Sequence, residues 1–169
     1  MTLAQLAALD RAAYMTAFGG LFEHSPWVAE AAWAQRPFAS EAALHDAMMN
    51  AVRDAPQPQQ IAFLNLHPEL AGKEAQAGTM TDHSTFEQHG AGLNALGRDE
   101  LLELQRLNAA YTERHGFPFI IAVLGHTKPQ IFEALRTRTG RDTDTERQEA
   151  LAQIAQITRR RLNALFAVS

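Results

Sequence analysis

Apolar residues recur at helical spacing along most of the chain, and the alternation of apolar and polar residues that marks half-buried strands is nearly absent. Residues that commonly cap helices stand in front of the apolar stretches. Thr2 precedes a first predicted helix that runs toward Gly19-Gly20, Ser25-Pro26 opens a second, and Ser40 opens a third. The stretch "QQIAFLNL" predicts a further helix that ends at His67-Pro68. The first part of the chain is therefore predicted to be helical.

Residues that commonly begin helices also recur toward the C-terminus. Further helices are predicted to begin at Ser84, Asp99, Pro129 and Thr145. One segment differs: "GFPFIIAVLG", residues 116–125, is a continuous apolar run between glycines, so it is either extended or a buried helical turn. If it is extended, its backbone groups need helix ends, water or a ligand as partners. We therefore predict an all-α fold, a single-domain compact helical bundle over residues 1–169, with an apolar extended or irregular segment near 116–125.

Length and composition narrow the possible functions. A chain of 169 residues with 46% hydrophobic content is sufficient for one domain with a substantial core. The net charge of −4 argues against a nucleic-acid partner, which needs clustered Lys and Arg. No cysteine is present, which excludes disulfides, thiolate zinc sites and cysteine catalysis. No apolar run approaches a membrane span and the N-terminus carries no targeting pattern, so we expect a cytoplasmic, bacterial-type protein.

The stretch "NLHPELAG" places a histidine directly before a proline. A residue before proline is disfavoured in the helical region, so His67 is predicted to lie where a helix ends and its imidazole leaves the packed face. Two interpretations are open at this point. The imidazole takes part in chemistry, or it only caps the helix.

A second polar cluster lies in "DHSTFEQHGAG". Ser84 and Glu87 have the spacing of a capping box. A helix that begins at Ser84 would have Glu87 and Gln88 in its first turn, where free N–H groups favour an anionic ligand. Gly90 and Gly92 indicate that another part of the chain packs close to the backbone there.

A metal site is an alternative for this cluster. His83 and Glu87 have the i, i+4 spacing that lets two side chains share a metal ion. His89, however, points elsewhere around the helix, and neither H-E-x-x-H nor a paired Glu-x-x-His is present. A metal site therefore stays a minor alternative.

The last predicted helix contains "ITRRRLNALF". At about 100° per residue, Arg161 falls within the apolar arc, Arg160 falls outside it and Arg159 lies at its margin. Arg161 either extends along the core to reach water, or it is buried with a carboxylate or with the oxygens of a polar substrate.

Taken together, "FGGLFEHSPWVAEAAW", "FLNLHPELAGK", "STFEQHGAGLNAL", "YTERHGFPFIIAVLG" and "RRRLNAL" resemble the OHCU decarboxylase family from one end of the chain to the other. These enzymes convert 2-oxo-4-hydroxy-4-carboxy-5-ureidoimidazoline (OHCU), formed in urate degradation, to (S)-allantoin and carbon dioxide. The resemblance implies an all-helical homodimer that needs neither metal nor organic cofactor, with OHCU and allantoin as its small-molecule ligands.

The resemblance also implies the site. It places the catalytic histidine on His67, with Glu87 beside it. It places the substrate contacts on Pro68, Ser84, Thr85, Phe86, Glu87, Gln88, Phe119, Ile120, Ile121, Ala122, Val123 and Arg161. In this interpretation Gln88 binds amide groups of the substrate and Arg161 binds a carbonyl oxygen. Two other classes remain: an inert helical binding or oligomerisation module, and a metal-dependent hydrolase that uses His83 and Glu87.

Overall fold

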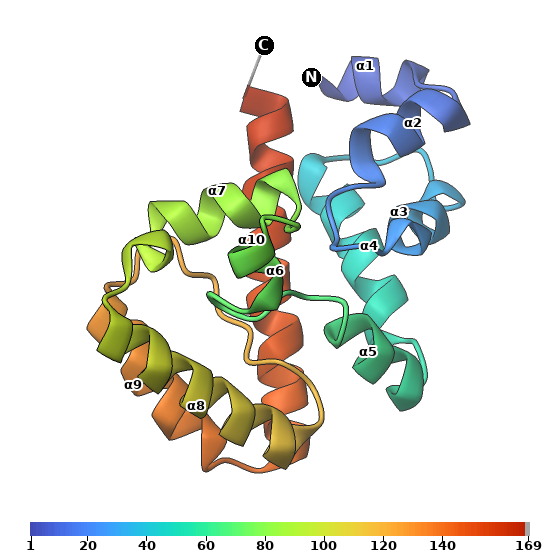
Figure 1. The fold of residues 1–169 in the computed structure, drawn as a ribbon. Helices are drawn as coiled ribbons and strands as arrows, with labels where there is room; N and C mark the ends of the chain where they lie inside the picture. Colours follow the sequence, from blue (N-terminus) through green and yellow to red (C-terminus); the bar gives the residue numbers. More distant parts are fainter. Residues whose placement is uncertain (168–169) are drawn as a thin grey trace. The chain divides into compact units, whose positions relative to one another are not determined.

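The computed structural model describes residues 1–167, which fall into two compact units (Figure 1). The first unit contains Met1–Leu66 and the C-terminal segment from Ala155, and the second contains His67–Ile154. Every regular element of the described residues is helical, so the predicted all-α class is confirmed. None of these helices combines the length and the apolar character needed to cross a membrane.

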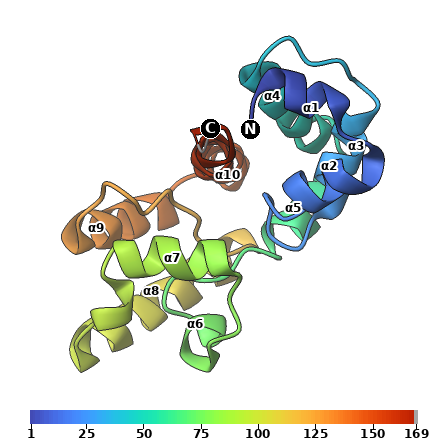
Figure 2. The ribbon, with the colours of Figure 1, turned by 90° about the horizontal axis from the view of Figure 1, so that it is seen from above.

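The first unit is built from five short helices and the end of a long one. They are α1 (Leu3–Ala8), α2 (Arg11–Phe18), α3 (Pro26–Trp33), α4 (Glu41–Arg53) and α5 (Gln57–Leu64). Within it, α3 packs against both α2 and α4 (Figure 2). Thr2 and Ser40 cap α1 and α4 as predicted, since their hydroxyls accept from Gln5 N and Ala43 N. Each such cap contributes about 1 kcal/mol.

Two predictions for the first unit need correction. The single helix expected from Thr2 to Gly19 is two helices, because Leu9 is extended and Asp10 caps α2 by accepting from Ala13 N. Pro26 does open α3, but Ser25 does not cap it with its side chain. The Ser25 hydroxyl donates to the Glu23 carbonyl oxygen instead, at 2.8 Å.

The second unit contains α6 (Lys73–Ala77), α7 (Asp82–Gly90), the 3-10 turn η1 (Leu93–Ala95), α8 (Arg98–His115) and α9 (Lys128–Thr139). The long helix α10 (Thr143–Ala167) begins in this unit and ends in the first. Helices α8 and α9 pack against each other (Figure 1). Residues 116–123 have no helical structure, which confirms the predicted irregular segment. Gly116 and Gly125 bound it with φ values of 80° and 93°, which few other residues adopt.

Candidate active site

His67 lies in a turn beyond the end of α5. That helix ends at Leu64 with Asn65 as its cap, so the prediction that the helix runs to His67 is wrong. His67 is half-buried, and Pro68 beside it is buried.

Residues 67–71, called the His67 turn below, are held by side chains from two helices. Ala71 has a positive φ of 48°, a conformation that costs a residue with a Cβ about 1 kcal/mol or more. Its N–H donates to Gln88 Oε1 at 2.9 Å, and Gln88 Nε2 donates to the Glu69 carbonyl oxygen at 3.3 Å. Asn108 Nδ2 of α8 donates to the Leu70 carbonyl oxygen at 3.0 Å. These bonds fix residues 69–71 directly after His67 and Pro68.

Gln88 therefore has a structural task that the sequence does not predict. The oxygen and the nitrogen of its carboxamide both bind the backbone of the His67 turn, and the residue is buried. Gln88 positions this turn, whether or not it also contacts a substrate.

Helix α7 begins earlier than predicted. Thr81 is its cap and accepts from Ser84 N at 3.3 Å, so the predicted Ser84–Glu87 capping box is wrong. Ser84 lies inside the first turn, and Glu87 and Gln88 lie beyond it, away from the free N–H groups of the helix start.

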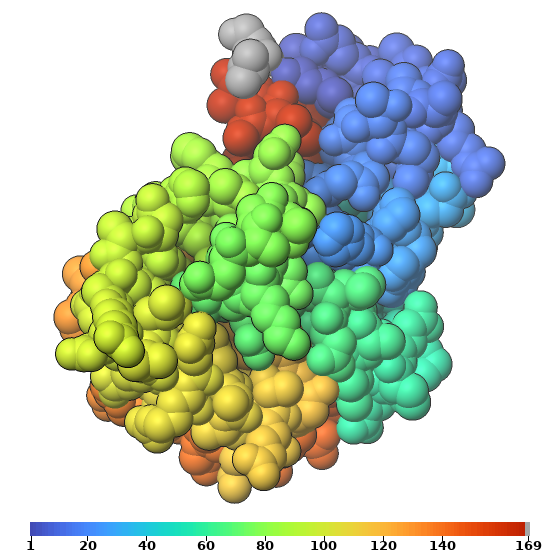
Figure 3. All heavy atoms as spheres, viewed as in Figure 1, coloured from blue at the N-terminus to red at the C-terminus, as the bar shows by residue number. Residues whose placement is uncertain are grey.

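The faces of α7 are clearly different. Ser84, Glu87 and Gln88 share one face at helical spacing, and Ser84 and Gln88 are buried. Thr85 is half-buried, whereas Phe86 is 72% exposed on the opposite side. Residues of α7, coloured green, lie on the surface of the second unit in Figure 3. The ring of Phe86 therefore does not belong to the face that meets the His67 turn.

The C-terminal end of α7 touches the end of the irregular segment. A Cβ added to Gly90 would lie 2.9 Å from Leu124 Cδ2, which confirms the predicted close packing at this glycine. Helix α7 thus contacts the His67 turn through Gln88 and the 116–125 segment at Gly90.

The irregular segment is buried, and its backbone is only partly paired. Its residues Phe119, Ile120, Ile121, Ala122 and Val123 are all buried. Ala122 N–H donates to Gln153 Oε1 at 2.9 Å, and the Ile120 carbonyl oxygen accepts from Arg138 Nη1 at 2.8 Å. Among residues 1–167, the N–H groups of Ile121 and Val123 have no hydrogen-bond acceptor. Backbone donors of buried residues that lack a protein partner can bind a polar ligand.

Arg161 lies in the first unit and points inward, as predicted. Its Nη2 pairs with Glu23 Oε1 at 3.1 Å and its Nη1 donates to the Leu21 carbonyl oxygen at 3.0 Å. Arg160 is exposed, and Arg159 is half-buried beside Asp46. The partner of the buried guanidinium is thus a carboxylate of the same chain.

Among residues 1–167, no three His, Asp or Glu side chains are arranged so that they could hold a metal ion.

Sequence reasoning missed three polar residues of the site. Glu23 directly follows the apolar residues Leu21 and Phe22. A carboxylate in an apolar stretch was the sequence signal that could have identified it. Arg138 follows Ile131 and Leu135 at helical spacing on the buried face of α9, which is the criterion that identified Arg161. No comparable signal marks Gln153.

These features define an all-α protein in which a histidine turn and a buried irregular segment meet the same short helix. The chain belongs to the OHCU decarboxylase family, whose model matches residues 7–163.

Curated relatives cover nearly the whole chain. A 2-oxo-4-hydroxy-4-carboxy-5-ureidoimidazoline decarboxylase of Haloferax volcanii is 41% identical over 98% of this chain and 96% of its own length. A mouse protein of the same name is 34% identical over 98% of this chain and 93% of its own. The uric acid degradation bifunctional protein PucL of Bacillus subtilis is 41% identical over 95% of this chain, which spans 32% of that protein.

Solved structures share the fold. A crystal structure of (S)-allantoin synthase superposes with a TM-score of 0.78 and 28% identity, over 98% of this chain and 54% of that chain. A crystal structure of OHCU decarboxylase in the presence of (S)-allantoin gives a TM-score of 0.66 at 23% identity, over 83% of this chain and 91% of that chain, and supports the fold alone.

Proposed function

We propose that this chain decarboxylates OHCU to (S)-allantoin in urate degradation, without metal or organic cofactor, and that His67 moves the protons. Family membership and the 41% identity to a full-length relative of that name support the reaction. The observation that carries the site is the position of α7, since Gln88 binds the His67 turn and Gly90 touches Leu124 of the irregular segment.

The chemistry of the substrate makes a cofactor unnecessary. The carboxylate of OHCU is bound to a ring carbon next to an imine carbon. When carbon dioxide leaves, the electron pair of the broken bond forms a carbon–carbon double bond, and the imine electrons move onto nitrogen, which takes a proton. The ring hydroxyl then loses its proton to become the carbonyl of allantoin, while the former imine carbon gains one. The enzyme has to handle protons and choose the face on which carbon is protonated.

Four of the predicted positions take direct parts in this proposal, besides Arg161. His67 takes the hydroxyl proton and delivers a proton to the ring carbon, because an imidazole exchanges protons near neutral pH. Glu87, on the same face of α7 as Gln88, orients the imidazole and accepts from the ureido N–H groups. The N–H groups of Ile121 and Val123 bind substrate oxygen atoms.

Arg161 is proposed to bind a carbonyl oxygen of the substrate, and its bonds to Glu23 and Leu21 fix the orientation of the guanidinium. Tight binding of the departing carboxylate by Arg161 would stabilise the substrate more than the transition state and slow the reaction.

The experiment that tests the proposal replaces His67 by glutamine and measures both rate and stereochemistry. The substrate is generated in place from urate by the two preceding enzymes, and product chirality is followed by circular dichroism. The His67→Gln protein should fold, lose most of its rate, and form allantoin that is close to racemic, because water then protonates either face. The control is His83→Gln, on the exposed side of α7, which should behave as wild type. A folded His67→Gln protein that makes (S)-allantoin at the wild-type rate refutes the role of His67.

The same proposal includes a homodimer, which rests on the family resemblance alone, and keeps the cytoplasmic location expected from the sequence. Light scattering coupled to gel filtration tests the dimer, and a monomer with full activity contradicts it.

A further inference from the structure

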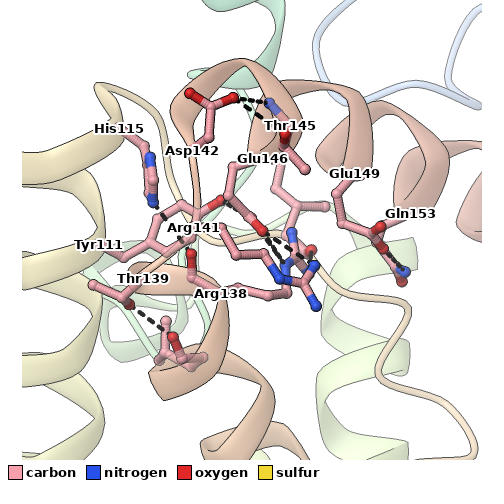
Figure 4. Close-up of polar contacts among 12 residues, drawn as sticks. Tyr111, His115, Arg138, Thr139, Arg141, Asp142, Thr145, Glu146, Glu149 and Gln153 are labelled. Carbon is pink, nitrogen blue, oxygen red and sulfur yellow. Dashed lines mark hydrogen bonds and ion pairs between the residues drawn. The ribbon is translucent and has the colours of Figure 1, made fainter.

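A buried ionic cluster lies behind the irregular segment. Glu146 of α10 is 0% exposed, and Arg138 of α9 is 4% exposed. Arg138 Nε lies 2.9 Å from Glu146 Oε2, and the Tyr111 hydroxyl of α8 donates to the same oxygen at 2.6 Å. Figure 4 shows these side chains directed toward one another. Three helices of the second unit thus meet at one carboxylate.

Stability alone is a weak reason for such a cluster. Withdrawing two charges from water costs several kcal/mol per ion, and well-packed apolar residues often serve as well. One nitrogen of Arg138, Nη2, is buried without a hydrogen-bond partner among the described residues, which adds to the cost. The cluster also fixes the geometry of the chain that it contacts.

The cluster contacts the irregular segment directly. Besides its bond to the Ile120 carbonyl oxygen, the Arg138 guanidinium lies 4.6 Å from the ring centroid of Phe119. The Tyr111 ring packs against Phe119 in a T-shaped contact, with 5.4 Å between the centroids. Phe119 and Ile120 are held between α8 and α9 by these contacts.

Gln153 of α10 adds a second point of attachment two residues further on. Its Oε1 accepts from Ala122 N–H at 2.9 Å, and its Nε2 donates to Glu149 Oε1 at 2.7 Å, which fixes the orientation of the carboxamide (Figure 4). Arg138 and Gln153 engage Ile120 and Ala122, and the intervening Ile121 keeps its N–H without a partner among residues 1–167.

We propose that Arg138, Glu146, Tyr111 and Gln153 are positioning residues for the reaction. They bind the backbone of Ile120 and Ala122 and thereby hold the N–H groups of the neighbouring Ile121 and Val123 at a fixed geometry for the substrate. This inference rests on the proposed function of that segment. None of the four side chains has to touch the substrate.

The sharpest test is Gln153→Met, which keeps the side-chain volume and removes the acceptor for Ala122 N–H together with the bond to Glu149 that orients it. We expect faster amide exchange at Ala122 in the free protein, a KM raised about fivefold, as for the loss of one neutral hydrogen bond, and a lower excess of (S)-allantoin. Gln148→Met, at an exposed position of the same helix, is the matched control. Wild-type KM and wild-type enantiomeric excess in Gln153→Met overturn the proposal.

A second pair of variants addresses the ionic cluster. Arg138→Lys keeps the charge but cannot donate to Glu146 and Ile120 from one planar fork, so KM should rise while the far-ultraviolet dichroism stays unchanged. Arg136→Lys, also on α9, alters an exposed ion pair with Glu103 of α8 and should leave KM unchanged. An unchanged KM in Arg138→Lys also overturns the proposal.

The two proposals fail in different ways. A wild-type protein that releases no carbon dioxide from OHCU contradicts the proposed function, whereas unaltered exchange at Ala122 in Gln153→Met contradicts the positioning role without any measurement of activity.

Discussion

His45 should make the first unit less stable as the pH falls from 7 to 5. The residue lies on α4, is 3% exposed, and its Nε2 is 2.9 Å from the Thr158 hydroxyl. Burial lowers the pKa of His45 from 6.5 to about 4; the nearby positive charges of Arg159 and Arg53 act in the same direction, and Asp46 opposes them. The folded protein therefore keeps this imidazole neutral at a pH where the unfolded chain binds a proton.

The sign and the size follow from this difference in pKa. Below pH 6.5 the unfolded state binds more protons at this position than the folded state. The free energy of unfolding therefore decreases as the pH is lowered, until about pH 4, where the folded state also takes up the proton. The full difference amounts to about 3 kcal/mol. About 2 kcal/mol of it is lost between pH 7 and pH 5.

Urea unfolding at the two pH values measures the effect. Both tryptophans, Trp27 and Trp33, lie in the first unit, so their fluorescence reports the part of the protein that contains His45. In His45→Gln, which cannot titrate, this part of the pH dependence should disappear. The stability difference between wild type and variant should therefore shrink by about 2 kcal/mol from pH 7 to pH 5. His89→Gln, at an exposed position, is the control. An equal difference at both pH values refutes the reasoning.

Two further predictions concern Arg161 and the absence of a cofactor. Arg161→Met removes the guanidinium that pairs with the buried Glu23, so the free energy of unfolding of the first unit should fall by about 3 kcal/mol or more. Arg160→Met, at an exposed position, should change it by less than about 0.5 kcal/mol. Equal losses in urea unfolding would contradict this assignment. Because the imine accepts the electrons, activity should survive exhaustive chelation, and a loss that zinc or manganese restores would contradict the mechanism.

Local chemistry explains which helix boundaries could be predicted. Thr2 and Ser40 cap helices as expected, because a hydroxyl in front of an apolar stretch needs only the next turn to act. The boundary at Asp10 was missed because a carboxylate inside an apolar stretch is compatible with either a helix interior or a new cap. At α7, Thr81 and Ser84 both have cap chemistry, and the burial of Ser84 and Gln88 on one face decides between them.

The inward arginines show where periodicity stops being informative. Helical spacing identifies Arg161, and the same criterion applied to α9 identifies Arg138. The spacing does not give the partner, because Glu23 is far from Arg161 in the sequence, and Glu146 is one of several carboxylates near Arg138. Pairing is decided by tertiary packing, which no local pattern records.

The His67 turn required the structure for a related reason. A proline predicts that the helix stops, but a positive φ at Ala71 is stable only because bonds from Gln88 and Asn108 offset its cost. Those bonds come from two other helices, so the conformation that presents His67 is a property of the assembled unit. Gln88 illustrates the consequence: its carboxamide is engaged by the turn, and a loss of activity in a Gln88 variant would follow from displacement of His67 as readily as from a lost substrate contact. A defect that appears as racemic product with substrate affinity retained would point to the displaced histidine.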